Sequence, residues 1–321
     1  MRLRTLLSCV LLLPCFLQSP ALAQDYPNRA VRILVPYGPG GATDIIARIV
    51  AARLTEALGQ SFLVENRPGA NGNLALEAAA KAPPDGYTLL VGNVSTNAIN
   101  ENTFAEQLKI KPSRDLVGIA KLVEIPHIVV ASASFPANNI AELVALAKKE
   151  PGKINFASVG MGSYPHLDAE RLMKAAGIQM THVPYKGEPP ALQDLLAGRI
   201  QVMFMAAAQP VVESGKARAL GTTSLEPWFT LPNVAPLDKA GLPGFKFYGW
   251  NGLTVKAGTP PAVVARLNAA ANEALQSPRV RKVLMDAGFM PAGGPPEKMG
   301  QTIRDDLAAY QKLIRDANLK F

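Results

Sequence analysis

Cysteine is the residue that this 321-residue chain most clearly lacks. The only two cysteines, Cys9 and Cys15, lie before Gln24. A chain that loses this segment has no thiol for a disulfide or for a thiolate metal site. Histidine is also scarce, and the three histidines stand at no recognised metal-ligand spacing. The sequence therefore predicts no metal site and no cofactor.

Long apolar runs are missing after Ala23, where nothing approaches the length that a membrane-spanning helix needs. Before that point, Arg2 and Arg4 precede an apolar stretch that ends in Ala21-Leu22-Ala23. This order of basic, apolar and small residues is typical of a secretory signal peptide. We therefore expect residues 1–23 to be a signal peptide that is cleaved after Ala23, and the exported mature chain not to insert into a membrane.

A basic patch interleaved with aromatic residues is absent as well. The formal net charge of +8 is spread along the chain, and the only short basic runs are Lys148-Lys149 and residues 279–282. Such runs are typical of solvated helix faces, so we expect no nucleic-acid partner. A positive surface weakly favours anionic ligands.

What the chain does contain is a glycine-rich loop between a strand and a helix. An apolar run at 31–35 is followed by Pro36-Tyr37-Gly38-Pro39-Gly40-Gly41 and by helical periodicity from about Thr43 to Leu58. Glycine allows close backbone approach and a helix start leaves N–H groups unpaired, so this loop suits a small anion such as a carboxylate. The lysine of a P-loop and the third glycine of a dinucleotide fingerprint are missing. A loop that only turns the chain is the alternative.

Three strands at 31–35, 62–65 and 87–92, separated by helices at 43–58 and 74–82, predict a parallel sheet. Such a sheet binds ligands at the carboxyl ends of its strands. The third strand is followed by Asn93-Val94-Ser95-Thr96-Asn97, which we interpret as a second ligand loop at the same edge, with a simple turn as the alternative.

The strand, glycine loop and helix pattern recurs at 154–176, where Gly160 and Gly162 lie in the loop. Further strands at 180–183, 200–204 and 217–221 each end in a loop. We predict an α/β fold of two lobes that close on one ligand. Lobe 1 comprises residues 24–124 and 248–321, lobe 2 comprises residues 125–247, and two crossing strands form the hinge.

Several segments in the same order resemble one protein family: Val35–Gly41, Glu65–Ala70, Pro84–Leu89, His182–Gly187 and Ala257–Pro260. The chain resembles the periplasmic solute-binding receptors of the tripartite tricarboxylate transporter type, also called Bug receptors, from about Tyr26 to the C-terminus. The resemblance implies a periplasmic Venus-flytrap protein that captures a small carboxylate and delivers it to a membrane transporter. We expect this receptor to be a monomer.

The resemblance also implies which residues bind the ligand. In lobe 1 they are Tyr37, Gly38, Gly40, Gly41, Ala42, Thr43 and Asp44, with Ser95, Thr96 and Asn97 after the third strand. In lobe 2 they are Ser158, Gly160, Gly162, Ser163 and His166, with Tyr185 and Lys186 nearby. Met205 departs from the family pattern, which often has an aspartate there. Met205 cannot pair with a ligand amine, so amino-acid ligands become less expected, and Met161 and Met205 would form apolar walls.

A secreted hydrolase or isomerase that uses Ser163 and His166 is the competing hypothesis. No Gly-x-Ser-x-Gly elbow surrounds Ser158 or Ser163, and neighbours in sequence do not by themselves make a triad. We therefore expect no catalytic residues. A sensor role, in which the closed receptor docks on a signalling protein, stays open. We expect His127 to be structural, beside the hinge, and Trp250 to pack in the core or between the lobes.

Overall fold

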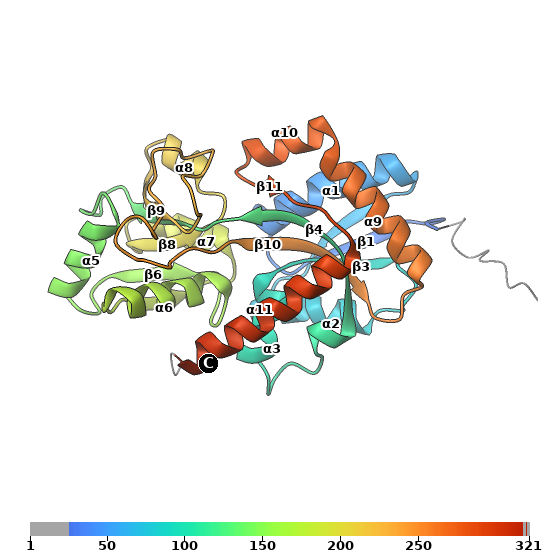
Figure 1. Cartoon of the computed structure of the whole chain (residues 1–321), viewed down its shortest axis with the longest axis horizontal. Helices are drawn as coiled ribbons and strands as arrows, with labels where there is room; N and C mark the ends of the chain where they lie inside the picture. The colour runs from blue at the N-terminus through green and yellow to red at the C-terminus, as the bar shows by residue number, and fades with distance from the viewer. Residues whose placement is uncertain (1–25, 317–318, 320–321) are drawn as a thin grey trace, which may run out of the picture.

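The computed structural model describes residues 26–316 and 319. They form two α/β units, each built on its own sheet (Figure 1). The predicted signal peptide, residues 1–23, lies outside the described residues. Within those residues, no helix combines the length and the apolar character that a membrane crossing requires.

The first sheet has six strands in the order β11-β4-β10-β3-β1-β2. They are β1 (Val31–Val35), β2 (Phe62–Asn66), β3 (Thr88–Asn93), β4 (Leu116–Ile125), β10 (Gly249–Lys256) and β11 (Met290–Pro291). As predicted, β1 is parallel to both β2 and β3, whereas β10 is antiparallel to β3 and β4. The glycine loop after β1 therefore lies at the same sheet edge as the end of β3.

Helices cover both faces of this sheet (Figure 1). They are α1 (Ala42–Leu58), α2 (Asn73–Lys81), α9 (Pro261–Gln276), α10 (Pro278–Asp286) and α11 (Pro296–Asp316), with the shorter η1 (Ala70–Gly72), η2 (Ser95–Ile99), α3 (Asn100–Thr103) and α4 (Pro112–Asp115). Alternate residues of β1 point to opposite faces, so Ile33 packs with α1 and α9, while Leu34 packs with α2. Burial on both faces explains why Ile33, Leu34 and Val35 are all apolar, whereas Arg32 near the start of β1 is exposed.

The second sheet has five strands in the order β7-β6-β8-β5-β9. They are β5 (Ile128–Ser132), β6 (Asn155–Ser158), β7 (Thr181–Pro184), β8 (Val202–Met205) and β9 (Ala217–Thr222). The helices are α5 (Ile140–Lys149), α6 (Tyr164–Ala176), α7 (Glu188–Leu196) and α8 (Gln209–Glu213). β6 is parallel to β7 and β8, so the ends of these three strands share one edge.

The chain passes between the two sheets twice, after β4 and before β10 (Figure 1). Pro126 and His127 join β4 directly to β5. α11 also reaches toward the second unit, where the Lys174 ammonium of α6 donates to the Asp316 carbonyl at 2.9 Å. The predicted two-lobed α/β fold with two crossings is confirmed.

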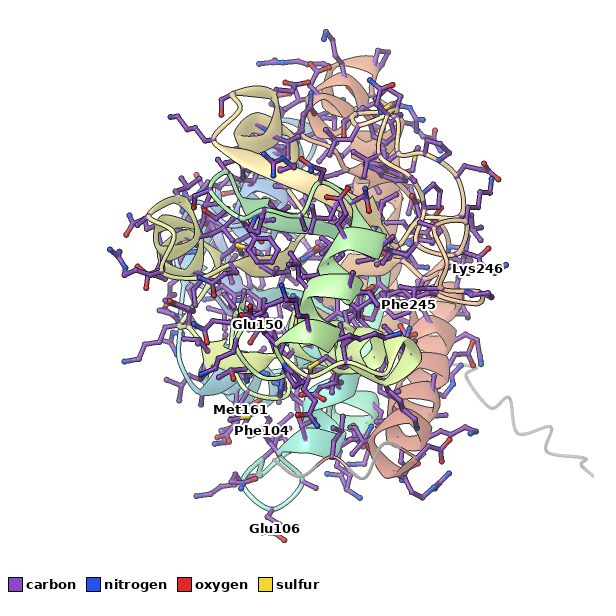
Figure 2. The ribbon with its side chains drawn as sticks, turned by 90° about the vertical axis from the view of Figure 1, so that its left-hand side faces the viewer. Phe104, Glu106, Glu150, Met161, Phe245 and Lys246 are labelled. Atoms are coloured by element: carbon purple, nitrogen blue, oxygen red, sulfur yellow. The ribbon has the colours of Figure 1, made fainter. Side chains whose placement is uncertain are left out.

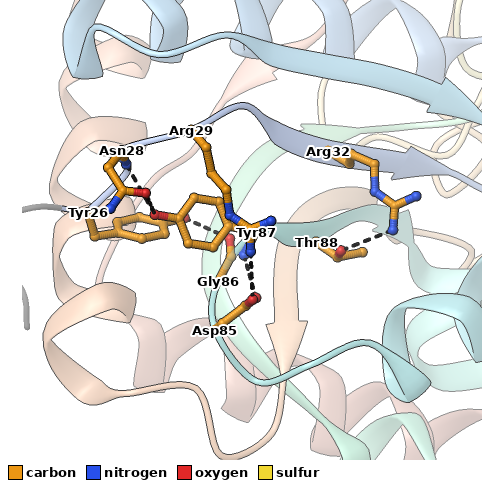
Figure 3. Close-up of polar contacts among 8 residues, drawn as sticks. All are labelled: Tyr26, Asn28, Arg29, Arg32, Asp85, Gly86, Tyr87 and Thr88. Carbon is orange, nitrogen blue, oxygen red and sulfur yellow. Dashed lines mark hydrogen bonds and ion pairs between the residues drawn. The ribbon is translucent and has the colours of Figure 1, made fainter.

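The first described residues are fixed to the turn before β3 (Figure 3). The Tyr26 hydroxyl donates to the Gly86 carbonyl at 2.7 Å, and Arg29 pairs with Asp85 at 3.1 Å. The Tyr26 ring also packs edge-on against Tyr87. These contacts hold the start of β1 beside β3 and so place the glycine loop.

Residues 95–97 differ from the predicted loop, because they form the π-helical turn η2. The Asn93 side-chain oxygen accepts from the Thr96 N–H, and the Thr96 hydroxyl accepts from the Asn93 N–H. This reciprocal pair resembles a capping box and starts a helix where short polar residues had suggested a turn. Ser95, Thr96 and Asn97 are consequently buried.

Candidate functional site

A cavity lies between the two units, where the ends of β1, β3, β6 and β8 meet. This first cavity contains about 640 Å³ of space that opens to solvent. Its polar and loop residues are Tyr37, Gly38, Gly41, Ala42, Thr43, Asn93, His127, Glu188 and Asn251. A second cavity is lined by Tyr37, Asn71, Val159, Gly160, Met161, Tyr185 and Lys186, among others. The two cavities share Tyr37 and Val159.

The N-terminus of α1 opens into the first cavity. Gly41 is the N-cap residue, and no side chain caps this helix. The first amides of α1 therefore lack a capping partner, and the positive end of the helix dipole faces the cavity wall formed by Gly41, Ala42 and Thr43. The Thr43 hydroxyl accepts from the Asn251 amide at 2.9 Å, which fixes this wall to β10. This arrangement can hold a carboxylate without a basic side chain.

Asp44 and Gly40 support the loop and do not line either cavity. The Asp44 carboxylate accepts from the Gly40 N–H at 3.0 Å, from Arg48 Nε at 3.0 Å and from the Asn66 amide at 2.8 Å. Burial alone would raise the pKa of Asp44, but these bonds hold it below its ordinary value. The Gly40 N–H is therefore already bonded, and Asp44 positions the loop.

Ser95, Thr96 and Asn97 line neither cavity. The Ser95 hydroxyl accepts from the Tyr164 N–H of α6 at 2.9 Å, so it joins the two units. Asn93 lines the first cavity instead, and its side-chain oxygen accepts from the Tyr37 hydroxyl at 3.2 Å. Burial raises the pKa of Tyr37 to about 12, although hydrogen bonds to Ser95 and Asn93 oppose the shift.

The second glycine loop makes contact with the first unit. A Cβ on Gly160 would lie 2.9 Å from the Asn71 side-chain oxygen, and one on Gly162 would lie 2.9 Å from Thr103 Cβ. Glycine at both positions therefore allows the units to approach closely. The Ser158 and Ser163 hydroxyls both donate to the Gly160 carbonyl, at 2.9 and 2.6 Å. Both hydroxyl donors are therefore used within the loop itself.

Two stacked histidine rings, His166 and His182, hold this second glycine loop in place. His166 Nδ1 accepts from the Gly162 N–H at 2.9 Å, and its ring stacks on His182 with centroids 3.8 Å apart. His182 Nε2 lies 2.6 Å from the Ser158 oxygen. Because the one Ser158 proton goes to Gly160, His182 Nε2 is the donor in this pair. Burial, with a smaller effect of His166, lowers the pKa of His182 to about 3, which keeps it neutral at pH 7.

Gly160, Tyr185 and Lys186 line the second cavity. The Tyr185 hydroxyl donates to Asp194, and its pKa is raised to about 12 by desolvation and by that carboxylate. Lys186 is exposed and forms no ion pair in the part of the chain that the structure describes. Figure 2 shows Met161 next to Phe104 of the first unit, and both residues line this second cavity.

Met205 does not form the apolar cavity wall that we expected. It is buried and packs with Met203 of β8, Ile128 of β5 and Ala191 of α7. Side chains alternate along a strand, so Met203 and Met205 share the α7 face, while Phe204 turns the other way and lines the first cavity.

Three titratable residues of the first cavity, His127, Tyr164 and Glu188, were missed as ligand candidates. His127, expected to be structural, lines the cavity, and its Nδ1 lies 2.6 Å from buried Asp168. Burial raises the pKa of Asp168, and His127 partly opposes this. Glu188 begins α7 before two prolines, a common helix start that carries no ligand signal by itself. Trp250 is buried against α11 residues and donates to Asp306, in keeping with the expected packing role, and it also lines the first cavity.

Metal-ligating side chains do not gather anywhere in residues 26–316: no group of three or more could hold an ion. The polar groups that line the first cavity include backbone amides, the side chains of Tyr37, Thr43, Asn93, Tyr164 and Asn251, and the ionisable side chains of His127 and Glu188.

The chain matches the model of the tripartite tricarboxylate transporter family receptor over residues 46–319. It is 32% identical over 304 residues to protein BugT of Bordetella pertussis, covering 94% of this chain and 93% of BugT. A solved R. palustris protein with adipate has a TM-score of 0.89 and 32% identity, over 92% of this chain and 99% of that chain. MatC of Rhodopseudomonas palustris, with bound malate, has a TM-score of 0.84 and 33% identity, over 90% of this chain and 100% of that chain.

These matches confirm the family that the sequence motifs indicated, because the similarity in sequence and in fold extends over nearly the whole chain. The chain belongs to the tripartite tricarboxylate transporter receptor family.

Proposed function

We propose that this chain is a periplasmic receptor that captures a small organic carboxylate between its lobes and delivers it to a tripartite-type membrane transporter. The observation that carries the proposal is the uncapped N-terminus of α1 at the first cavity. Relatives of the same fold with adipate and malate support a carboxylate as the ligand. In this proposal residues 1–23 are the signal peptide, and the receptor acts as a monomer.

The ligand carboxylate accepts hydrogen bonds from the amides at the start of α1, flanked by Tyr37 and Gly38. The lobes, which we place at residues 24–124 with 248–321 and at 125–247, then close over it. In the closed arrangement the start of α7 lies over the loop, with Glu188 Cβ 3.9 Å from a Cβ placed on Gly41. A ligand that contacts both lobes only when they are closed shifts the population toward that state.

The residues of the second glycine loop serve closure in this mechanism. Gly160 and Gly162 meet the first lobe, while Ser158, Ser163 and His166 hold the loop in shape. A hydrolase based on Ser163 and His166 receives no support, because the Ser163 hydroxyl donates to Gly160 and the two His166 nitrogens lie against the Gly162 amide and Glu170. We therefore propose a binding protein and not an enzyme.

A thermal-shift screen of the ligand-stripped mature chain tests this function. The panel holds mono-, di- and tricarboxylates, aromatic acids and amino acids. A ligand at one hundred times its Kd should add about 2.7 kcal/mol to the free energy of unfolding. If no acid raises the wild-type Tm, the carboxylate function is wrong.

Gly41→Val tests the site directly. Gly41 has a φ of −82°, which valine can adopt, and the added side chain would extend toward Glu188. We expect a folded variant whose Tm no longer responds to the acids. Ala52→Val, on the exposed side of α1, creates the same β-branched side chain outside the cavity and should keep the response. Equal loss of stability and binding in Gly41→Val would show that the glycine is only structural.

A further inference from the structure

Glu188 is an acidic side chain in a cavity that we propose binds an acid. It lines the first cavity together with Gly41 and His127. Its Cβ lies 3.9 Å from a Cβ placed on Gly41, so the start of α7 lies close to the amides that would hold the ligand carboxylate. A ligand that is negative at both ends would bring its second charge close to that of Glu188, which is unfavourable.

Glu188 forms no ion pair with any residue in the ranges 26–316 and 319. Desolvation raises the pKa of this carboxyl, and the charge of His127 and the backbone of Ala206 offset the shift only in part. His127 is itself paired with Asp168 through Nδ1, at 2.6 Å. Glu188 is only partly exposed, and a carboxyl group in such a place that forms no ion pair gains from a hydrogen-bond donor that the ligand supplies.

The first turn of α7 itself offers few donors to a second ligand carboxylate. Pro189 and Pro190 follow Glu188 in the first turn of α7, and proline has no N–H. Gly187, the N-cap residue, contributes no side chain. The neighbouring wall residues Val159 and Phe204 are apolar. The two lobes therefore present opposite chemistry: backbone donors at α1 and an acceptor at α7.

We infer that Glu188 is a specificity-determining residue, which selects carboxylates that carry an ammonium or hydroxyl group at their other end. The ligand carboxylate lies on the α1 amides, and the ammonium or hydroxyl donates to Glu188. This inference rests on the proposed function. It also revises the expectation drawn from Met205, because the acid that pairs with an amine comes from α7 and not from β8.

Calorimetric titration of the ligand-stripped mature chain with matched probes tests the inference. The four-carbon probes are butanoate, 4-hydroxybutanoate, 4-aminobutanoate and butanedioate, and the six-carbon set repeats the same end groups. We expect the ω-amino acid to bind at least about tenfold more tightly than the dicarboxylate of equal length. The ω-hydroxy acid should fall between the two. This order of affinities can be measured on the wild-type chain alone.

Glu188→Gln removes the charge at nearly constant size. We expect it to lose most of the preference for the ω-amino acid and to bind the dicarboxylate more tightly than the wild type does. Glu150→Gln is the matched control, since Glu150 is exposed and follows the last residue of α5. Figure 1 shows α5 on the side of the second unit that faces away from the first. Glu150→Gln should leave the order unchanged.

Two negative results have different meanings. A wild-type chain that binds the dicarboxylates most tightly, with the same order in Glu188→Gln, overturns the role of Glu188 and leaves the carboxylate receptor intact. A wild-type chain that binds none of these probes and nothing in the wider acid panel overturns the proposed function itself.

Discussion

Hydrogen bonds within the loops determine which polar side chains of this protein remain available to a ligand. Asp44 accepts from Gly40, Arg48 and Asn66, and Ser158 and Ser163 both donate to Gly160. These residues have the chemistry of ligand contacts but already have partners inside the protein. The start of α1 has no such side-chain partner.

His182 makes the stability of the fold depend on pH. Its pKa in the folded chain is about 3, against about 6.5 when unfolded, so the unfolded chain binds the extra proton between these values. The free energy of unfolding should therefore fall as pH drops from 6.5 toward 4. The glutamine of His182→Gln still has an N–H donor for Ser158 but does not titrate. The free energy of unfolding of this variant should therefore fall less over the same pH range than that of the wild type. Urea unfolding at pH 7 and pH 5 measures this, and equal losses in both proteins would contradict it.

At the scale of elements, the two glycine loops share a pattern but lead into helices with different partners. The loop after β1 leads into the uncapped α1, and its residues line the first cavity. The loop after β6 leads into α6, whose first amide, Tyr164 N–H, donates to Ser95 of the other unit. In the proposed function, one loop therefore offers amides to a ligand, while the other joins the two units.

Gly160→Ala should weaken closure. The new Cβ would lie 2.9 Å from the Asn71 oxygen, at a φ of 147° that favours glycine. Gly152→Ala is the control, because its φ of 76° is also positive but nothing lies within 4 Å of the added Cβ. Both variants should lose about 1–2 kcal/mol of stability from backbone strain. Only Gly160→Ala should also lose affinity for the acid found in the screen, by about tenfold, or ~1.4 kcal/mol. Equal affinities in the two variants would argue against a closure role.

At the scale of the whole molecule, the two units are joined by contacts between residues far apart in the chain. Ser95 and Tyr164 are 69 positions apart, and Lys174 reaches the end of α11. Such contacts stabilise the closed state without touching a ligand, so they should set the affinity through the closed population.

Ser95→Ala tests this coupling. The variant leaves the Tyr164 N–H without its acceptor when the lobes are closed, while Tyr37 keeps Asn93 as a partner. We expect about fivefold weaker ligand binding, from the loss of ~1 kcal/mol, and a larger radius of gyration in small-angle scattering. Ser132→Ala removes a bond to Ser134 within the second unit and should change neither quantity. A similar loss of affinity in Ser132→Ala would contradict the cross-lobe explanation.

The sequence by itself determined the α/β class, the parallel pairing of β1, β2 and β3, the two crossings and the family. Apolar periodicity, helix stops such as Gly59 and the glycine loops act over a few residues, so they can be recognised in a linear chain. Only the tertiary structure decided that Glu188 and His127 line the cavity, while Met205 and Asp44 do not. A side chain's surroundings depend on partners distant in sequence, such as Asn251 on Thr43, 208 positions away. Residue type gives the chemistry, and the packing of the two sheets determines whether a ligand can reach it.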